Sequence, residues 1–207
     1  MDMDEKQKEL IDQIVKSEWE MFQQVKNQGG RASCQDDWIT FEIMRKSQFM
    51  AWDSVTRMSY MMDLLNAEGM GRNLPMEKYA RMMQHTAPAE YEKIADALPE
   101  LPPEQWAAID RIAEIHVAWE KEFAKKSPKL VQAGRPITKE EERPGETSAE
   151  TYLRGELATY SAETVAAYMQ HVMQLQAEGK NICEMILENT VKMYGYDSVE
   201  QYEALVK

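Results

Sequence analysis

The sequence predicts an all-α fold, a single-domain bundle of about four long helices with several short helices. Apolar residues recur at intervals of three and four along most of the 207-residue chain, the spacing of helices with one buried face. Valine and isoleucine never alternate with polar residues over a useful length, so the sequence indicates no strand. A chain of this length can bury a substantial core, and we expect residues 1–207 to form a single helical domain.

The composition argues against several classes of protein. A net charge of −12 disfavours a nucleic-acid partner, because binding to phosphate backbones requires clustered Lys and Arg. No apolar run approaches the ~20 residues that span a bilayer, and the acidic start MDMDEKQKE does not resemble a signal peptide. We therefore expect a cytoplasmic protein without membrane contact. Cys34 and Cys183 lack the spacing of a metal motif and are expected to be free thiols.

The first helix is expected from Glu5 to Gln28, with Gly29 and Gly30 ending it. Glu18 lies in the middle of its apolar face. Burying that carboxylate without a partner would be costly, so it should meet a cation, a metal or a proton. Two interpretations stay open, a structural ion pair with a buried arginine and a role in a ligand site.

The next segment is a tight loop, in which Asp36 or Asp37 is expected to cap the following helix. Backbone N–H groups at a helix start, beside Arg31, suit a carboxylate or phosphate. The loop lacks the Gly-Lys-Ser/Thr ending of a P-loop. Cys34 lies in the same loop, where a nearby helix start and Arg31 would lower the pKa of a catalytic thiol. The alternative for Cys34 is a small packed loop residue.

The second helix is expected from Trp38 to Ala67, and polar residues interrupt its apolar face. Arg45 and Gln48 lie on that face, where an arginine is rare unless its guanidinium is paired. A buried Glu18–Arg45 pair would explain the pattern, and a ligand pocket built from several converging polar groups is the interpretation we favour. The apolar residues of this face are Phe41, Met44, Trp52, Val55 and Met62.

Two short helices are expected over residues 76–84 and 86–98. Tyr79, Met82 and Met83 share the expected inner face of the first, whereas Arg81 and His85 do not. An arginine four positions before a histidine occurs in some ribonuclease helices, but this spacing is too common to indicate that activity.

A long helix is expected from Glu104 to Lys126, with His116 at the centre of its apolar face and Glu120 one turn later. A histidine and a carboxylate at this spacing can share a metal or a proton, although a core histidine bonded to a carbonyl is the commoner case. The charged Pro- and Gly-rich stretch 127–147 is expected to be a surface crossover, with a lid over a site as the alternative.

The last long helix is expected from Ser148 to Glu178, capped by Thr147 or Ser148 and stopped by Gly179. Its apolar face contains three polar residues, with Glu156 at the border. Two further helices are expected over residues 181–194 and 199–206. The three polar residues of the long helix are Tyr160, Thr164 and His171.

Polar residues therefore lie on the apolar faces of all four long helices. Helical bundles build ligand and metal sites in this way, from side chains on facing helices. Without any Glu-x-x-His pair a dinuclear carboxylate site is disfavoured, but His116, His171 and a carboxylate such as Glu120 could hold one zinc or iron ion. The sequence does not show whether these residues meet.

Four segments resemble an uncharacterised bacterial family, domain of unknown function 4125. The resemblance extends along most of the chain, thins beyond about Pro88 and implies no established activity. Its motifs coincide with the residues chosen from the helical faces, which favours a site near Arg31, Cys34, Arg45 and Gln48. The segments are EWEMF (18–22), GGRASCQDD (29–37), MRKSQFMAW (44–52) and GRNLPMEKYARMM (71–83).

Two hypotheses for the function follow. In the first, a polar pocket in the bundle binds an anionic small molecule, and Cys34 or a histidine supplies chemistry. In the second, a non-catalytic accessory protein docks a partner enzyme or another copy of the chain through exposed methionines. The expected ligand-binding residues are Glu18, Arg31, Asp36, Arg45, Gln48, Trp52 and Tyr160.

Overall fold

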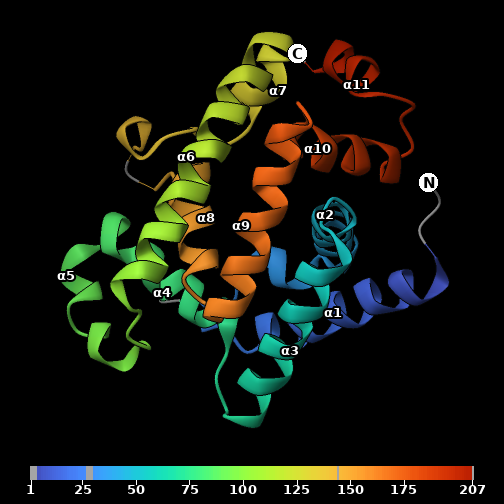
Figure 1. Ribbon diagram of the computed structural model, residues 1–207. Helices are drawn as coiled ribbons and strands as arrows, with labels where there is room; N and C mark the ends of the chain where they lie inside the picture. Colours follow the sequence, from blue (N-terminus) through green and yellow to red (C-terminus); the bar gives the residue numbers. More distant parts are fainter. Residues whose placement is uncertain (1–3, 27–29, 144, 207) are drawn as a thin grey trace.

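The computed structural model describes residues 4–26, 30–143 and 145–206, and every described regular element is helical, as the sequence predicts. The first helix ends at Gln23 with Gln24 as its C-cap, so the expected extension to Gln28 is wrong; Gln28 and Gly29 themselves lie outside the described residues. The described helices form an all-α single domain (Figure 1). The α-helices are α1 (Glu5–Gln23), α2 (Trp38–Met50), α3 (Ser54–Gly69), α4 (Leu74–Thr86), α5 (Pro88–Tyr91), α6 (Pro103–Lys126), α7 (Pro128–Ala133), α8 (Ala149–Leu157), α9 (Ala162–Ala177), α10 (Ile182–Met193) and α11 (Val199–Leu205).

Two of the helices that we expected to be continuous are each broken into two. The expected helix 38–67 is α2 and α3, because the Asp53 carboxylate accepts a hydrogen bond from the Thr56 N–H at 2.8 Å and starts a new helix. The expected helix 148–178 is α8 and α9, because Ser161 caps Thr164 in the same way. Asp37 and Ser148 cap α2 and α8, as expected.

The break after α2 explains an error in the expected buried face. A helix interrupted for three residues does not keep its phase, so the face read across residues 38–67 is wrong beyond Trp52. Val55 and Met62 are more than half exposed. Met44 is also exposed, but it lies in α2 before the break, so the break does not account for it. The face of α3 that packs into the core instead contains Tyr60, Leu64 and Ala67.

One main apolar core joins the helices. Long α6 and α9 lie side by side through the middle of the molecule, α8 packs on α6, and α3 packs on α9 (Figure 1). α1 contacts α2, α3 and α4, while α4 makes an extensive contact with α8. Four of the described helices therefore surround one region of the core, namely α1, α2, α4 and α8. The site lies in that region.

The stretch 127–147 is not a structureless crossover. It contains α7 and a short 3-10 helix, Lys139–Glu141, and α7 is tied to the C-terminal segment by hydrogen bonds from the Lys129 and Leu130 N–H groups to Glu203. In the described residues, no helix is both long enough and apolar enough to cross a membrane.

Candidate functional site

The site is built on an ion pair between α1 and α2. The Arg45 guanidinium donates through Nε to Glu18 Oε2 at 2.6 Å and through Nη2 to Glu18 Oε1 at 2.5 Å. This is the bidentate geometry that arginine and carboxylate adopt when both are withdrawn from water. Glu18 is 4% exposed and Arg45 9% exposed, so each charge requires the other.

A second carboxylate, Glu156 of α8, completes the coordination of Arg45. It accepts from Arg45 Nη2 at 3.0 Å and from Nη1 at 3.3 Å, while Gln48 bonds both Arg45 and Glu156. Each of the five N–H groups that a guanidinium carries thus has an acceptor inside the protein. Arg45 has no N–H left for a ligand, so the geometry favours a positioning role for it.

Lys78 of α4 is the second cation of the cluster. Its Nζ donates to Glu156 Oε2 at 2.6 Å and lies 3.4 Å from the centroid of the Tyr152 ring. Burial is the largest influence and would lower the pKa of Lys78, but the interactions with Glu156, Tyr152 and Tyr79 together outweigh it and the pKa is raised. Lys78 therefore stays protonated near neutral pH.

Two buried tyrosines add hydrogen bonds to the carboxylates. Tyr60 donates to Glu18 Oε1 at 2.6 Å, and Tyr160 donates to Glu156 Oε1 at 2.8 Å. Burial and then the adjacent carboxylate raise the pKa of each phenol, so both remain donors. Burial would raise the pKa of Glu156, yet Arg45 and Lys78 hold it well below its usual range.

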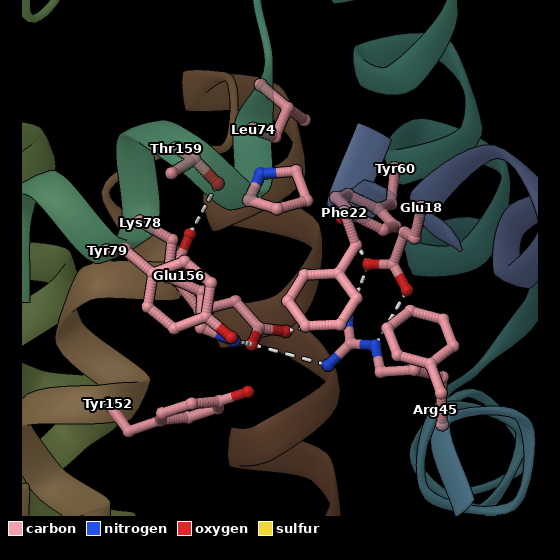
Figure 2. A pocket seen from close by; sticks show the side chains of 12 residues that line it. Glu18, Phe22, Arg45, Tyr60, Leu74, Lys78, Tyr79, Tyr152, Glu156 and Thr159 are labelled. Atoms are coloured by element: carbon pink, nitrogen blue, oxygen red, sulfur yellow. Dashed lines mark hydrogen bonds and ion pairs between the residues drawn. The ribbon is translucent and has the colours of Figure 1, made fainter. Parts of the chain in front are cut away.

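A small pocket opens beside this cluster, with a cavity volume of about 40 Å³. In Figure 2, Tyr79 and Tyr152 lie on one side of Glu156, and Phe22 and Arg45 on the other. Within the described residues, no hydrogen bond occupies the hydroxyl of Tyr79 or Tyr152. Lys78 has three N–H groups, of which one bonds Glu156 and another faces the Tyr152 ring. The pocket therefore presents unused donors between aromatic rings.

The charges of the pocket define what it can do. Glu18 and Glu156 balance Arg45 and Lys78, so the four charged side chains sum to zero. The pKa of Lys78 is raised, that of Glu156 is lowered, and burial followed by Tyr152 raises that of Tyr79. These groups keep their protonation state through neutral pH. The arrangement favours binding of a ligand by fixed donors over proton transfer.

Among the residues expected from the sequence, Glu18, Arg45, Gln48 and Tyr160 meet in this cluster. Trp52 is buried beside it, with its ring centroid 5.8 Å from that of Tyr60, and does not line the pocket.

The loop residues expected at the site do not line the pocket. Arg31 donates to Asp36 at 2.8 Å in an exposed ion pair, and neither lines the pocket. Cys34 is exposed on the 3-10 helix Ser33–Asp36, which is attached to the end of α1 by hydrogen bonds from Gln35 to the Phe22 and Val25 carbonyls. Arg31 and Cys34 do not line the pocket beside Arg45, although Cys34 interacts electrostatically with the pocket residue Tyr79, and a shared site of Arg31, Cys34 and Arg45 stays a prediction.

Of the expected metal ligands, His116 and Glu120 both contact Cys183, whereas His171 has other partners. His116 is bonded to the Tyr168 hydroxyl at 3.0 Å, and burial lowers its pKa to about 4. His171 is bonded to the Ala51 carbonyl at 3.0 Å, while burial raises the pKa of Glu120. The described residues contain no group of three His, Cys, Asp or Glu side chains arranged to hold a metal ion. The interpretation of His116, Glu120 and His171 as one metal site is therefore not supported.

Lys78 is the main residue that sequence reasoning missed. Leu74, Lys78 and Met82, at i, i+4 and i+8, form a buried face of α4, and Arg81 is also buried, contrary to our expectation. The spacing of these residues indicates a buried face. It was missed because the prediction assumed that α4 has one buried side, whereas α1 and α8 cover it on two sides. Tyr60, Tyr79 and Tyr152 were missed because a tyrosine on an apolar face looks like core.

Comparison with known proteins places the chain in a family without giving it an activity. No curated protein and no solved structure matches it. The family model described as "Protein of unknown function (DUF4125)" matches residues 8–204, which confirms the expected family and extends the match well beyond Pro88. The chain therefore belongs to the DUF4125 family.

Proposed function

We propose that the pocket beside the Glu18–Arg45–Glu156–Lys78 cluster binds a small polar molecule through an acceptor group such as a carboxylate. The observation that carries this proposal is Lys78, a buried ammonium that faces the pocket and has an N–H to spare. A buried cation whose donors are not all used is a natural partner for a ligand oxygen.

The aromatic walls support the same proposal. Lys78 packs against the Tyr152 ring, and Tyr79 and Tyr152 offer hydroxyls next to apolar ring faces. Ligand pockets typically combine apolar walls with a few fixed polar groups in this way. A cavity of about 40 Å³ accepts only part of a molecule, such as a carboxylate, and the rest would lie against the rings at the mouth. The Glu18–Arg45 pair then fixes the position of Glu156, and Glu156 fixes that of Lys78.

The test is enrichment of small molecules from a cell extract on purified protein, read by mass spectrometry. We expect one or a few acceptor-bearing compounds to be enriched by the wild type and lost with Lys78→Met and with Tyr152→Leu. Lys180→Gln is the matched control, because Lys180 is an exposed lysine paired with Glu178. Enrichment that survives both pocket variants, or no enrichment by the folded wild type, would contradict the proposal.

A second candidate function, docking of another protein, rests on the exposed face of α3. Four apolar side chains at spacings of three, four and three residues face solvent, namely Val55, Met58, Met62 and Leu65, each between 46% and 62% exposed. This a/d spacing is the one by which helices pair. Met58→Glu with Met62→Glu should abolish a complex seen for the wild type by light scattering or pull-down, and should leave small-molecule enrichment intact. A wild type that is monomeric and has no partner would refute this candidate.

A further inference from the structure

A second, larger hollow lies on the other side of the contact between α4 and α8. We call it the Arg81 groove, and its cavity volume is about 380 Å³. Arg81 and His85 of α4, Trp106 of α6 and Arg154 of α8 line it together with Lys139. The volume falls within the range of small-molecule sites, roughly 300–1,000 Å³.

The two hollows are separated by a close helix contact. A Cβ on Gly155 would lie 2.9 Å from Met82 Cγ and 3.1 Å from the Lys78 carbonyl oxygen, so α8 rests almost directly on α4. On α8, Tyr152 and Glu156 face the pocket, whereas Thr151 and Arg154 face the groove. A ligand in the groove would therefore not touch the Lys78 pocket.

Arg81 is the unusual residue of the groove. It is only 8% exposed, and the one hydrogen bond that it makes to the described residues runs from Nη2 to the Pro99 carbonyl at 2.6 Å. Its Nε has no acceptor, and in the described part of the chain no carboxylate forms an ion pair with it. The nearby Glu77 carboxylate is already held by Arg72 at 2.6 Å and 2.8 Å. A buried guanidinium without a counter-charge is unfavourable unless an anion joins it.

The neighbouring side chains complete an anion site with an aromatic wall. Trp106 places its ring 5.8 Å from the Arg81 guanidinium. Lys139 is exposed at the edge of the groove and makes no ion pair with the carboxylates that the structure describes. Of the acidic groups in the groove, Asp110 is bonded to Arg154, and Glu114 is paired with Arg111 at 3.3 Å. The acids are thus partly neutralised, whereas Arg81 and Lys139 are not.

We propose that the Arg81 groove binds a small molecule that carries an oxyanion on a flat ring. Arg81 and Lys139 bind the oxyanion, and Trp106 packs against the ring. A phosphate and a carboxylate share this chemistry, because both offer two coplanar oxygens to a guanidinium. This site is independent of the proposed function of the Lys78 pocket.

Calorimetric titration with three probes, inorganic phosphate, phenyl phosphate and benzoate, tests the proposal. We expect saturable binding of phenyl phosphate or benzoate, with phenyl phosphate at least several-fold tighter than inorganic phosphate because of the ring. Arg81→Met should weaken binding at least tenfold, and Lys139→Gln, on an exposed residue that the fold does not need, several-fold. Trp106→Leu should reduce the advantage of phenyl phosphate over phosphate.

Two controls separate the groove from general charge and from the pocket. Lys192→Gln removes an exposed positive charge on α10 and should leave binding of the probes unchanged. Lys78→Met removes the cation of the pocket, and the component of probe binding that Arg81→Met weakens should persist in it. A preference for phenyl phosphate over benzoate would assign the phosphate class, and the reverse the carboxylate class. Binding that is insensitive to Arg81→Met and Lys139→Gln, or no saturable binding of any probe, would overturn the proposal.

Discussion

Removing the charge of Glu156 tests how the buried cluster supports the fold. Glu156 is 4% exposed and accepts five hydrogen bonds, two from Arg45 and one each from Gln48, Lys78 and Tyr160. In Glu156→Gln one of the two oxygens becomes an NH₂ group, which must face the Lys78 ammonium or the Arg45 guanidinium. Removing one member of a buried ion pair costs about 3–5 kcal/mol, because the partner charge remains buried.

We expect Glu156→Gln to lower the free energy of unfolding at pH 7 by about 3–5 kcal/mol, measured by urea denaturation with the m-value compared. The double variant Glu156→Gln with Lys78→Met should lose less free energy of unfolding than the two single variants lose in sum, because Lys78→Met removes the ammonium that Glu156→Gln leaves unpaired. Glu178→Gln is the control on an exposed pair with Lys180, and should leave the free energy of unfolding close to that of the wild type. A loss below about 1 kcal/mol for Glu156→Gln would refute the reasoning, since it would mean that the cluster behaves like a solvated surface pair.

Four further predictions concern pH, packing, capping and thiol reactivity. The pKa of His116 falls from 6.5 to about 4 on folding, so the unfolded chain binds the proton first, and stability is full above pH 6.5 and decreases as pH falls toward 4. His116 lowers the free energy of unfolding by at most about 3 kcal/mol over this range. Urea denaturation from pH 7.5 to 4.5 should show that the stability of His116→Phe depends less steeply on pH than that of the wild type; equal pH dependence in the two proteins would contradict this. Gly155→Ala should destabilise the protein by about 1–3 kcal/mol in thermal unfolding because of the Met82 and Lys78 contacts, whereas Gly69→Ala, where a Cβ meets nothing within 4 Å, should not. Asp53→Ala should cost about 1 kcal/mol by circular-dichroism melting, through the lost cap of α3; no loss would mean that the break after α2 has another cause. In the folded protein Cys34 should react with Ellman's reagent much faster than Cys183, because Cys34 is exposed, whereas burial and then Glu120 raise the pKa of Cys183; equal rates would show that Cys183 is accessible.

The fold class and the central ion pair could be predicted from the sequence because both depend on local periodicity. Glu18 and Arg45 interrupt apolar faces, and a buried charge of each sign on neighbouring helices has few ways to be satisfied except by pairing. The same reasoning found Gln48 and Tyr160. The same reasoning placed Glu156 only at the border of an apolar face. Glu156 contacts Arg45 because of how α8 packs against the other helices, and the periodicity of a single helix does not show that packing.

The errors have physical causes as well. Asp53 and Ser161 cap the starts of α3 and α9. The prediction did not use them as helix starts, so it joined separate helices and assigned the wrong buried face to α3. Arg31, Cys34 and Asp36 share a segment with strong motifs, yet proximity in sequence did not place them in the pocket. His116 and His171 occupy apolar faces of α6 and α9, but a hydroxyl and a carbonyl satisfy them separately. Long-range geometry decides whether polar residues on several helices meet.

The most direct test of the central claim, that the pocket beside Lys78 binds a small molecule, is a crystal structure of the protein with the compound that it enriches from an extract. The account predicts an acceptor atom of that compound within hydrogen-bond distance of Lys78 Nζ, about 3 Å, with its remainder against Tyr79 and Tyr152. A compound bound at the α3 face or in the Arg81 groove, with the pocket filled by the protein's own side chains, would contradict the claim.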